Sequence, residues 1–457
     1  MRRPAPIIFL LASIIASCTT KTDSHRDSAS SAATTSSDST RSATAAGATT
    51  ASGANASASA SGDTTGATGG AARAGASASG GTMGNAPSSG FVAGAHLKDA
   101  PATVRALYVN RWASQSVKRM RELMKIADET EINGMVLDLK DEFGLNFPSK
   151  DASVARNAGH SGTIPHLKEL IDTLHAHGLV LIARQVTFKD SVAARMNPQH
   201  TIRKPDGSAW NDKQGLTWVD PYDPMIREYN IRVAEELSRM GFDEIQFDYV
   251  RFPEPYPSLP KQTFSDANGV SRPQALADFL GAACKRINAL GSRCTADIFG
   301  LVTTVRGPLE IGQEWEKVSP VVDVVLPMTY PSHYPPGSFG IPRPNAEPEK
   351  IQRLAISKAH DRDIALKITK PEHVRPWVQA FTLGAPAYGP ADIEAQKRGI
   401  YAAGYDGWVL WNPGSKYEIF VPALEKTLEK RAAPYPPSGG AAARTPAGTD
   451  SGKTPPR

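Results

Sequence analysis

A regular alternation of strand-length and helix-length segments through the middle of the chain limits its fold more than any other feature. Short apolar, β-branched runs are each followed by an amphipathic stretch with helical periodicity. The runs that predict strands are 104–110, 134–140, 180–186, 244–250, 295–300, 322–330, 365–369 and 407–411. The stretches that predict helices are 117–130, 164–177, 225–240, 273–290, 348–360, 390–403 and 419–430. Strands and helices that alternate in this way predict a single (β/α)₈ TIM barrel.

The residues at the expected helix ends agree with this interpretation. Pro273 and Pro390 lie near helix starts, and Gly178, Gly241 and Gly404 follow helix ends, which are the positions that these residues prefer. A doubly wound sheet is the alternative. It favours a glycine-rich phosphate loop after the first strand, where this chain reads Tyr-Val-Asn-Arg-Trp. The barrel is therefore the favoured α/β architecture.

Composition separates the middle of the chain from its ends. Hydrophobic residues make up 40% of the 457 residues, which is less than the roughly 45–50% of a typical globular protein. The large hydrophobic residues are scarce in two segments: 18–95, which is rich in Ser, Ala, Thr and Gly, and 433–457, which is rich in Pro, Gly and Ala. Such segments lack the apolar side chains that offset the entropy of ordering a chain. We expect a disordered tether at 18–95, a barrel at 100–432 and a disordered tail at 433–457. The tether either holds the domain clear of a surface or is a spacer of no selected length.

The N-terminus predicts export. Two arginines precede an apolar run at 7–15, a pattern typical of a secretory signal peptide, here at 1–17. The segment ending at Cys18 reads Ile-Ala-Ser-Cys and resembles the bacterial lipobox, in which the cysteine is acylated. That resemblance implies a lipid anchor at Cys18, a membrane partner and a place in the cell envelope. Thr19, where an Asp would favour the inner membrane, favours the outer membrane. An ordinary signal peptide with a chance cysteine is the alternative.

The remaining composition excludes several classes of partner. The net charge of +5 is spread through 21% charged residues rather than gathered on one basic face, so we expect no nucleic-acid partner. His175 and His177 have a metal-ligand spacing but fall at a helix end, where the dipole favours a cap. We expect no cofactor and no metal, with Ca²⁺ or Mg²⁺ among the carboxylates of 138–142 as the less favoured alternative.

Cys284 and Cys294 lie in a helix and at the start of the next strand, and in an exported protein they are either paired or free.

Chemically active side chains gather at the expected carboxyl ends of the strands, where barrel enzymes place their active sites. Carboxylates for proton transfer and aromatic faces for sugar stacking are what a glycosidase requires. The carboxylates are Asp138, Asp141, Glu142, Asp248 and Asp297. The candidate substrate-binding residues are Asn110, Trp112, Lys140, Arg184, Arg251, Tyr330, His333, Tyr334, Trp377, Trp411 and Asn412.

Five motifs carry a resemblance to a known family. The segment 241–253 reads Gly-Phe-Asp-Glu-Ile-Gln-Phe-Asp-Tyr-Val-Arg-Phe-Pro and resembles the fourth-strand signature of the bacterial putative glycoside hydrolase domain. That family is distantly similar to α-amylase-like TIM barrels. The motifs at 297–300, 327–334, 375–381 and 407–413 support the resemblance, which spans 104–430. It implies a carbohydrate substrate and hydrolysis of glycosidic bonds.

The resemblance also implies roles for single residues. In α-amylase-like barrels the fourth strand supplies an Asp nucleophile with an Arg two positions earlier, and the fifth strand supplies a Glu acid. Here Asp248 takes the Asp position, Gln246 replaces the Arg and Asp297 replaces the Glu. We therefore expect hydrolysis by two carboxyl groups, with Asp248 as nucleophile or base and Asp297 as acid. The reserve carboxyls are Asp138, Asp141 and Glu142. The alternative function is a non-catalytic carbohydrate-binding or envelope-scaffolding lipoprotein on a degenerate barrel.

Overall fold

The computed structural model describes residues 94–426. The chain divides into the units Met1–Ser88 and Ser89–Arg457, and the described residues all belong to the second. The signal peptide, Cys18, almost all of the tether and the tail at 433–457 lie outside the described residues. Within 94–426, no helix combines the length and the apolar character that a membrane span requires.

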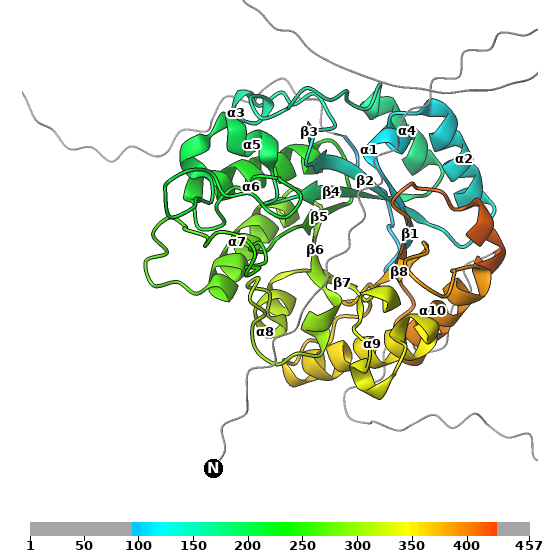
Figure 1. Cartoon of the computed structure of the whole chain (residues 1–457). Coiled ribbons are helices and arrows are strands. Elements are labelled where there is room, and N and C mark those ends of the chain that lie inside the picture. Colours follow the sequence, from blue (N-terminus) through cyan, green and yellow to red (C-terminus); the bar gives the residue numbers. More distant parts are fainter. Residues whose placement is uncertain (1–93, 427–457) are drawn as a thin grey trace, which may run out of the picture. The chain divides into compact units, whose positions relative to one another are not determined.

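A parallel β-barrel forms the centre of the described domain, with the larger helices around it (Figure 1). The strands are β1 Arg105–Val109, β2 Gly134–Asp141, β3 Gly144–Leu145, β4 Val180–Val186, β5 Glu244–Asp248, β6 Arg293–Phe299, β7 Val324–Met328, β8 Trp377–Gln379 and β9 Trp408–Trp411. The α-helices are α1 Arg111–Ser114, α2 Val117–Asp128, α3 Ala152–Ala155, α4 Leu167–Ala176, α5 Ser191–Met196, α6 Pro224–Arg239, α7 Arg272–Asn288, α8 Trp315–Val318, α9 Pro348–Ala365 and α10 Pro390–Ala402. The 3₁₀ helices are η1 Pro198–His200, η2 Gly300–Thr303, η3 Ser319–Val321, η4 Pro331–His333, η5 Ser338–Gly340, η6 Pro344–Ala346 and η7 Glu418–Ala423.

The strand order confirms the predicted barrel. Neighbours run β7-β6-β5-β4-β2-β1-β9-β8, and β3 is a short antiparallel hairpin partner of β2. The two ends of this order meet where Val325 pairs with Val374. There the Arg375 amide donates to the Val325 carbonyl at 2.9 Å, an ordinary hydrogen-bond distance. The eight parallel strands therefore form a nearly closed barrel.

Two of the expected elements differ in the structure. The predicted strand at 365–369 is wrong, because α9 continues to Ala365 and Leu366 caps it, so the seventh barrel strand is β8. Lys367 then takes a left-handed conformation, with φ of 61°, which turns the chain away from an extended path. The described part of the predicted helix at 419–430 is the 3₁₀ helix η7. It contains Pro422, which lacks the backbone N–H that an α-helix would use.

Side-chain alternation along the strands divides the apolar core in two. One cluster fills the barrel interior with residues such as Ala106, Val136, Ile182 and Leu326. The intervening residues face outward and pack against the helices, as Leu107 does in β1. Strand residues that alternate between two buried environments read as continuous apolar runs, which is why the strands were recognisable in the sequence.

The amino ends of the strands form the closed end of the barrel. Glu244 opens β5 and accepts hydrogen bonds from Arg375 at 2.7 and 3.1 Å, and Arg293 also pairs with it. Although burial opposes the charge, Arg293 and Arg375 together lower the pKa of Glu244 to about 2. The incoming segment lies at this end too, where the Leu97 amide donates to Asp243 at 2.6 Å. Nearby, a disulfide joins Cys284 of α7 to Cys294 of β6.

Glu244→Gln tests this buried ion pair. It leaves Arg375 buried without its partner charge, so we expect the free energy of unfolding at pH 7 to fall by about 3–5 kcal/mol. The folded pKa of about 2 lies below the ordinary value, so the stabilisation is present above about pH 4.3 and is lost as pH falls toward 2. In urea titrations, the difference in the free energy of unfolding between wild type and variant should therefore become smaller as the pH falls over that range. Glu349→Gln, which breaks an exposed pair with Arg398, is the control, and an equal loss in both variants would contradict the account.

Candidate active site

Arg184 connects the carboxyl ends of three neighbouring strands. Its Nη1 donates to Asp138 at 2.5 Å, while its Nη2 and Nε donate to one oxygen of Asp248 at 2.5 and 3.0 Å. The strand register places Arg184 of β4 opposite Asp138 of β2, and Asp248 ends β5 on the other side. The pairing of β2 with β4 shifts between Asp138 and Lys140, an irregularity that redirects the side chains beyond it. One cation thus holds two carboxylates at the mouth of the barrel.

Asp138 is enclosed on its other side by aromatic rings. The Tyr108 hydroxyl donates to it at 2.5 Å, and the Tyr108 ring stacks on Trp411 with centroids 4.0 Å apart. Burial raises the pKa of Asp138 to about 6, against the opposing charge of Arg184. Burial, followed by the charge of Asp138, also raises the pKa of Tyr108. Asp138, Tyr108 and Trp411 therefore form one side of the mouth.

Asp297 lies next to Asp248, because their two strands pair in register just below them. The Gln246 amide donates to both oxygens of Asp297, at 2.7 and 2.8 Å, and the Trp377 indole donates at 2.6 Å. Burial and then the charge of Asp248 raise the pKa of Asp297 well above its usual range, which favours a protonated carboxyl. Gln246 therefore holds Asp297, while the cation that faces Asp248 comes from β4 as Arg184.

The two predicted catalytic carboxyls differ in their access to solvent. Asp248 is 7% exposed and Asp297 is 1% exposed. Gln246 and Trp377 occupy both oxygens of Asp297. The structure brings Asp248 and Asp297 together, with Asp297 as the more deeply enclosed of the two.

The carboxyls at the end of β2 take two different environments. Asp141 accepts from Arg111 Nε and Nη2 at 2.7 and 2.8 Å, a bidentate pair within the protein. Glu142 follows at the tip of the β2–β3 hairpin, half-buried, and no described residue makes a hydrogen bond or ion pair with it. Arg111 was not singled out in the sequence, because a cation after a strand does not by itself reveal its partner.

Two predicted substrate-binding cations are occupied by other protein groups. Lys140 is buried, pairs with Asp190 at 2.8 Å and also donates to the Val186 carbonyl. Arg251 is buried with its guanidinium over three aromatic rings, 4.8–5.1 Å from their centroids, and it pairs with Glu254 at 3.0 Å. These cations hold the strand ends and the adjoining loops in place.

The two predicted asparagines support loops at the mouth. Asn110 caps α1 by accepting from the Ala113 amide at 2.8 Å, and it donates to the Pro413 carbonyl at 2.8 Å. Asn412 donates to the Ala380 carbonyl at 2.6 Å. Both amides are thus engaged by backbone groups of the protein.

The predicted aromatic residues differ in how far their side chains are exposed to solvent. Trp377, Tyr330 and Tyr334 are buried, and Trp411 is half-buried. His333 is exposed beside Tyr330, with ring centroids 5.2 Å apart. Trp112 is 57% exposed, and Phe143 beside it is 48% exposed, with ring centroids 5.8 Å apart. Phe143 was not singled out in the sequence, because the β2–β3 hairpin that carries it is too short to give a strand pattern.

The long segment between β4 and α6 packs as ordered structure. It contains α5 and η1, and antiparallel bridges join Thr201 to Val219 and Arg203 to Ala209. Trp210 and Trp218 are fully buried within it. Both rings belong to the apolar cluster that packs around the outside of the barrel.

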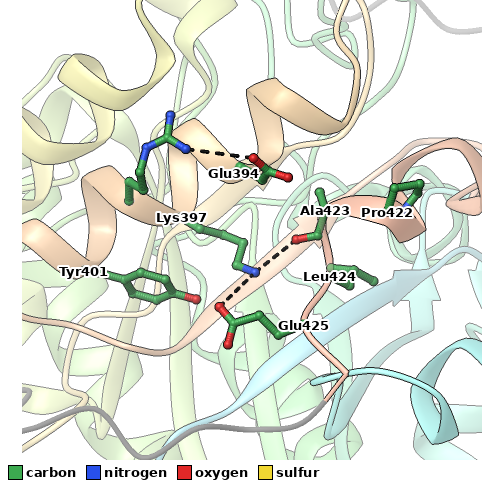
Figure 2. Close-up of a pocket in the computed structure, with 8 residues that line it drawn as sticks. Glu394, Lys397, Tyr401, Pro422, Ala423, Leu424 and Glu425 are labelled. Atoms are coloured by element: carbon green, nitrogen blue, oxygen red, sulfur yellow. Dashed lines mark hydrogen bonds and ion pairs between the residues drawn. The ribbon is translucent and has the colours of Figure 1, made fainter.

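A separate pocket of about 320 Å³ lies beside α10 and η7 (Figure 2), and none of the carboxyls at the mouth lines it. Lys397 extends along it and donates to the Ala423 carbonyl at 3.1 Å, and it pairs with Glu425 at 3.5 Å. Lys397 also pairs with Glu131, which binds Arg105 at the amino end of β1. The charges at this pocket thus pair with one another at the closed end of the barrel.

Among residues 94–426, no group of three or more His, Cys, Asp or Glu side chains is arranged to hold a metal ion.

Comparisons with known proteins agree with the barrel. The sequence model of a family described as "putative glycosyl hydrolase domain" matches residues 106–417. No curated protein matches the sequence.

Among solved structures, a hypothetical protein from Ruminiclostridium thermocellum is 32% identical over 42% of this chain and 96% of that one, with a TM-score of 0.38. The glycoside hydrolase domain of PgaB (BpsB) from Bordetella bronchiseptica is 13% identical over 71% of this chain and 99% of that one, with a TM-score of 0.51. At this identity the similarity to PgaB shows a shared fold.

Proposed function

Because the chain belongs to the family described as putative glycosyl hydrolase domain, we propose that it hydrolyses a glycosidic bond of an oligosaccharide or polysaccharide at the mouth of its barrel. The observation that carries the proposal is the pair of neighbouring carboxyls with contrasting environments. Asp248 faces the Arg184 guanidinium, and Asp297 beside it has a raised pKa because of burial and the charge of Asp248. Neighbouring carboxyls held in different protonation states are typical of glycosidase sites.

Asp248 is the carboxylate that stabilises the positive charge developing on the sugar. The transition state of glycoside hydrolysis resembles an oxocarbenium ion, and a fixed carboxylate close to it acts as nucleophile or as the base for a water molecule. Arg184 and the Tyr249 amide, which donates to Asp248 Oδ1 at 2.6 Å, hold the carboxylate in place. A carboxylate held in this way needs little reorganisation as the reaction proceeds.

Two properties of Asp297, the predicted acid, point in opposite directions. Its protonation state suits a proton donor, but its burial keeps it from a substrate. Its raised pKa keeps a proton available. A general acid must also lie within hydrogen-bond reach of the leaving oxygen, and Asp297 is 1% exposed with both oxygens bound to Gln246.

The anchoring proposal concerns the other end of the molecule. We propose that Cys18 is acylated and that the domain is held at the cell envelope. The described chain enters at the closed end of the barrel, where the Gly94 amide donates to the Arg239 carbonyl at 2.8 Å, and it leaves there too, where the Glu131 amide donates to the Glu425 carbonyl at 2.7 Å. The described chain therefore begins and ends at the end of the barrel opposite the mouth.

Cys18→Ser tests the anchor. We expect cells grown with labelled palmitate to label the wild-type protein and not the variant, because the acylated thiol is absent. Cys284 and Cys294 form a disulfide, so they do not compete for acylation. Equal labelling of both proteins, or labelling of neither, would contradict the anchoring proposal and leave the enzymatic one unaffected.

Asp248→Asn tests the enzymatic proposal. Wild type is incubated with a panel of α- and β-linked oligosaccharides of neutral, N-acetylated and amino sugars, and products are detected by mass spectrometry. We expect the variant to lose at least about 100-fold in kcat/KM, because an amide can act neither as nucleophile nor as base, while it still binds the substrate. Asp172→Asn, at an exposed pair with Lys168, should match wild type. Binding without turnover by wild type would favour the non-catalytic carbohydrate-binding function.

A further inference from the structure

Glu142 differs from the other carboxyls at the mouth in having no partner among the described residues. Asp138, Asp141, Asp248 and Asp297 each accept hydrogen bonds from neighbouring side chains. Glu142 accepts none from residues 94–426 and is half-buried rather than enclosed. Its carboxyl is therefore open to a group that enters from solvent.

The hairpin that carries Glu142 is held at several points. Asp141, directly before Glu142, is fixed by the bidentate pair with Arg111. Directly after the tip, the Leu145 amide donates to the Ala158 carbonyl at 3.0 Å. Gly144 has a φ of 103°, and a Cβ there would lie 2.2 Å from the Ala158 oxygen, so the hairpin packs closely on its neighbour. A side chain on such a support keeps its place in the site.

The charge of Glu142 acts on a tyrosine on each side of the Arg184 cluster. Tyr108 binds Asp138, and Tyr249 directly follows Asp248. Burial and the nearest aspartate raise the pKa of both tyrosines, and the charge of Glu142 adds to the rise in each case. Glu142 thus lies within electrostatic range of residues on both sides of the Arg184 cluster.

The alternative donors are less available. Asp138 has one oxygen on Arg184 and the other on Tyr108. Asp297 is 1% exposed and is bound by Gln246 and Trp377. Either residue would have to give up a hydrogen bond inside the protein before it touched a substrate oxygen, and buried groups left without partners are costly.

The exposed pair Trp112 and Phe143 adds a place for the leaving group. Phe143 is the residue next to Glu142, and its ring lies 5.8 Å from that of Trp112. Exposed aromatic faces on rigid supports suit the apolar face of a sugar ring. A sugar stacked there would place its glycosidic oxygen beside the hairpin tip and would exclude water from Glu142.

We propose that Glu142 donates the proton to the leaving glycosidic oxygen, in an extension that rests on the proposed glycosidase function. The proton passes from the Glu142 carboxyl to that oxygen as the bond from the oxygen to the anomeric carbon breaks, and the bonding electron pair stays on the oxygen. The anomeric carbon then bonds to Asp248 or to a water molecule that Asp248 deprotonates. If the carbon bonds to Asp248, a water molecule that loses its proton to Glu142 then attacks the anomeric carbon, and the bond to Asp248 breaks. If water attacks directly, the proton taken up by Asp248 passes to solvent, and solvent restores the proton of Glu142.

The test varies the leaving group. Phenyl and 2,4-dinitrophenyl glycosides of the sugar that wild type releases are hydrolysed by wild type, Glu142→Gln, Asp297→Asn and Glu129→Gln. A dinitrophenolate leaves without protonation, whereas a phenolate of high pKa needs the acid. We expect Glu142→Gln to lose at least about 100-fold in kcat/KM on the phenyl glycoside and less than about 10-fold on the dinitrophenyl glycoside. It should also lose the alkaline limb of the wild-type pH profile.

The controls separate the possible outcomes. Glu129→Gln, a surface glutamate on an exposed pair, should match wild type on both substrates, and Asp297→Asn should affect both equally. Equal losses on both substrates for Glu142→Gln, or a loss confined to the phenyl glycoside for Asp297→Asn, would overturn the assignment while leaving the glycosidase function intact. If wild type hydrolyses neither glycoside nor any member of the oligosaccharide panel, the assignment fails together with the proposed function.

Discussion

The shared guanidinium of Arg184 is the interaction on which the mouth of the barrel depends. Two carboxylates, Asp138 and Asp248, meet one cation in a region that water barely enters. Buried charges are tolerated only when they are paired, so Arg184 makes it possible for three strand ends to carry charged side chains together. Arg184 makes no hydrogen bond with Asp297 in the described structure, and burial and the charge of Asp248 raise the pKa of Asp297 against the opposing charge of Arg184. The contrast between neighbouring carboxyls follows from this shortage of positive charge.

The two ends of the barrel use charge in different ways. At the closed end, Glu244 is matched by Arg293 and Arg375 and its pKa is lowered to about 2. At the mouth, carboxylates outnumber the cations that face them, and burial raises the pKa of Asp138 to about 6 against the opposing charge of Arg184. Matched charges stabilise a fold, whereas unmatched ones are available for proton transfer. The chain also enters and leaves at the closed end, so structural and chemical tasks are separated along the barrel axis.

The sequence predicted the path of the backbone better than it predicted which side chains pair with one another. Buried parallel strands read as apolar runs, so the barrel and the position of Asp248 were predictable. The strand β8 was missed because it has three residues, too few to show a period, and a longer apolar stretch at the end of α9 resembled a strand. Lys140 and Arg251 were expected to face substrate, but each is buried against protein groups. Which of several cations pairs with a carboxylate depends on register and bulges, and these are set by the assembled sheet.

We propose that a sugar is bound and cleaved at the mouth of the barrel, over Asp248. A crystal structure of the Asp248→Asn variant with the oligosaccharide that wild type cleaves tests this most directly. We expect a sugar ring against Tyr108 and Trp411, with its anomeric carbon facing residue 248 and the leaving sugar toward Trp112 and Phe143. A sugar bound instead in the pocket beside α10, or elsewhere on the surface with the mouth empty, would contradict it.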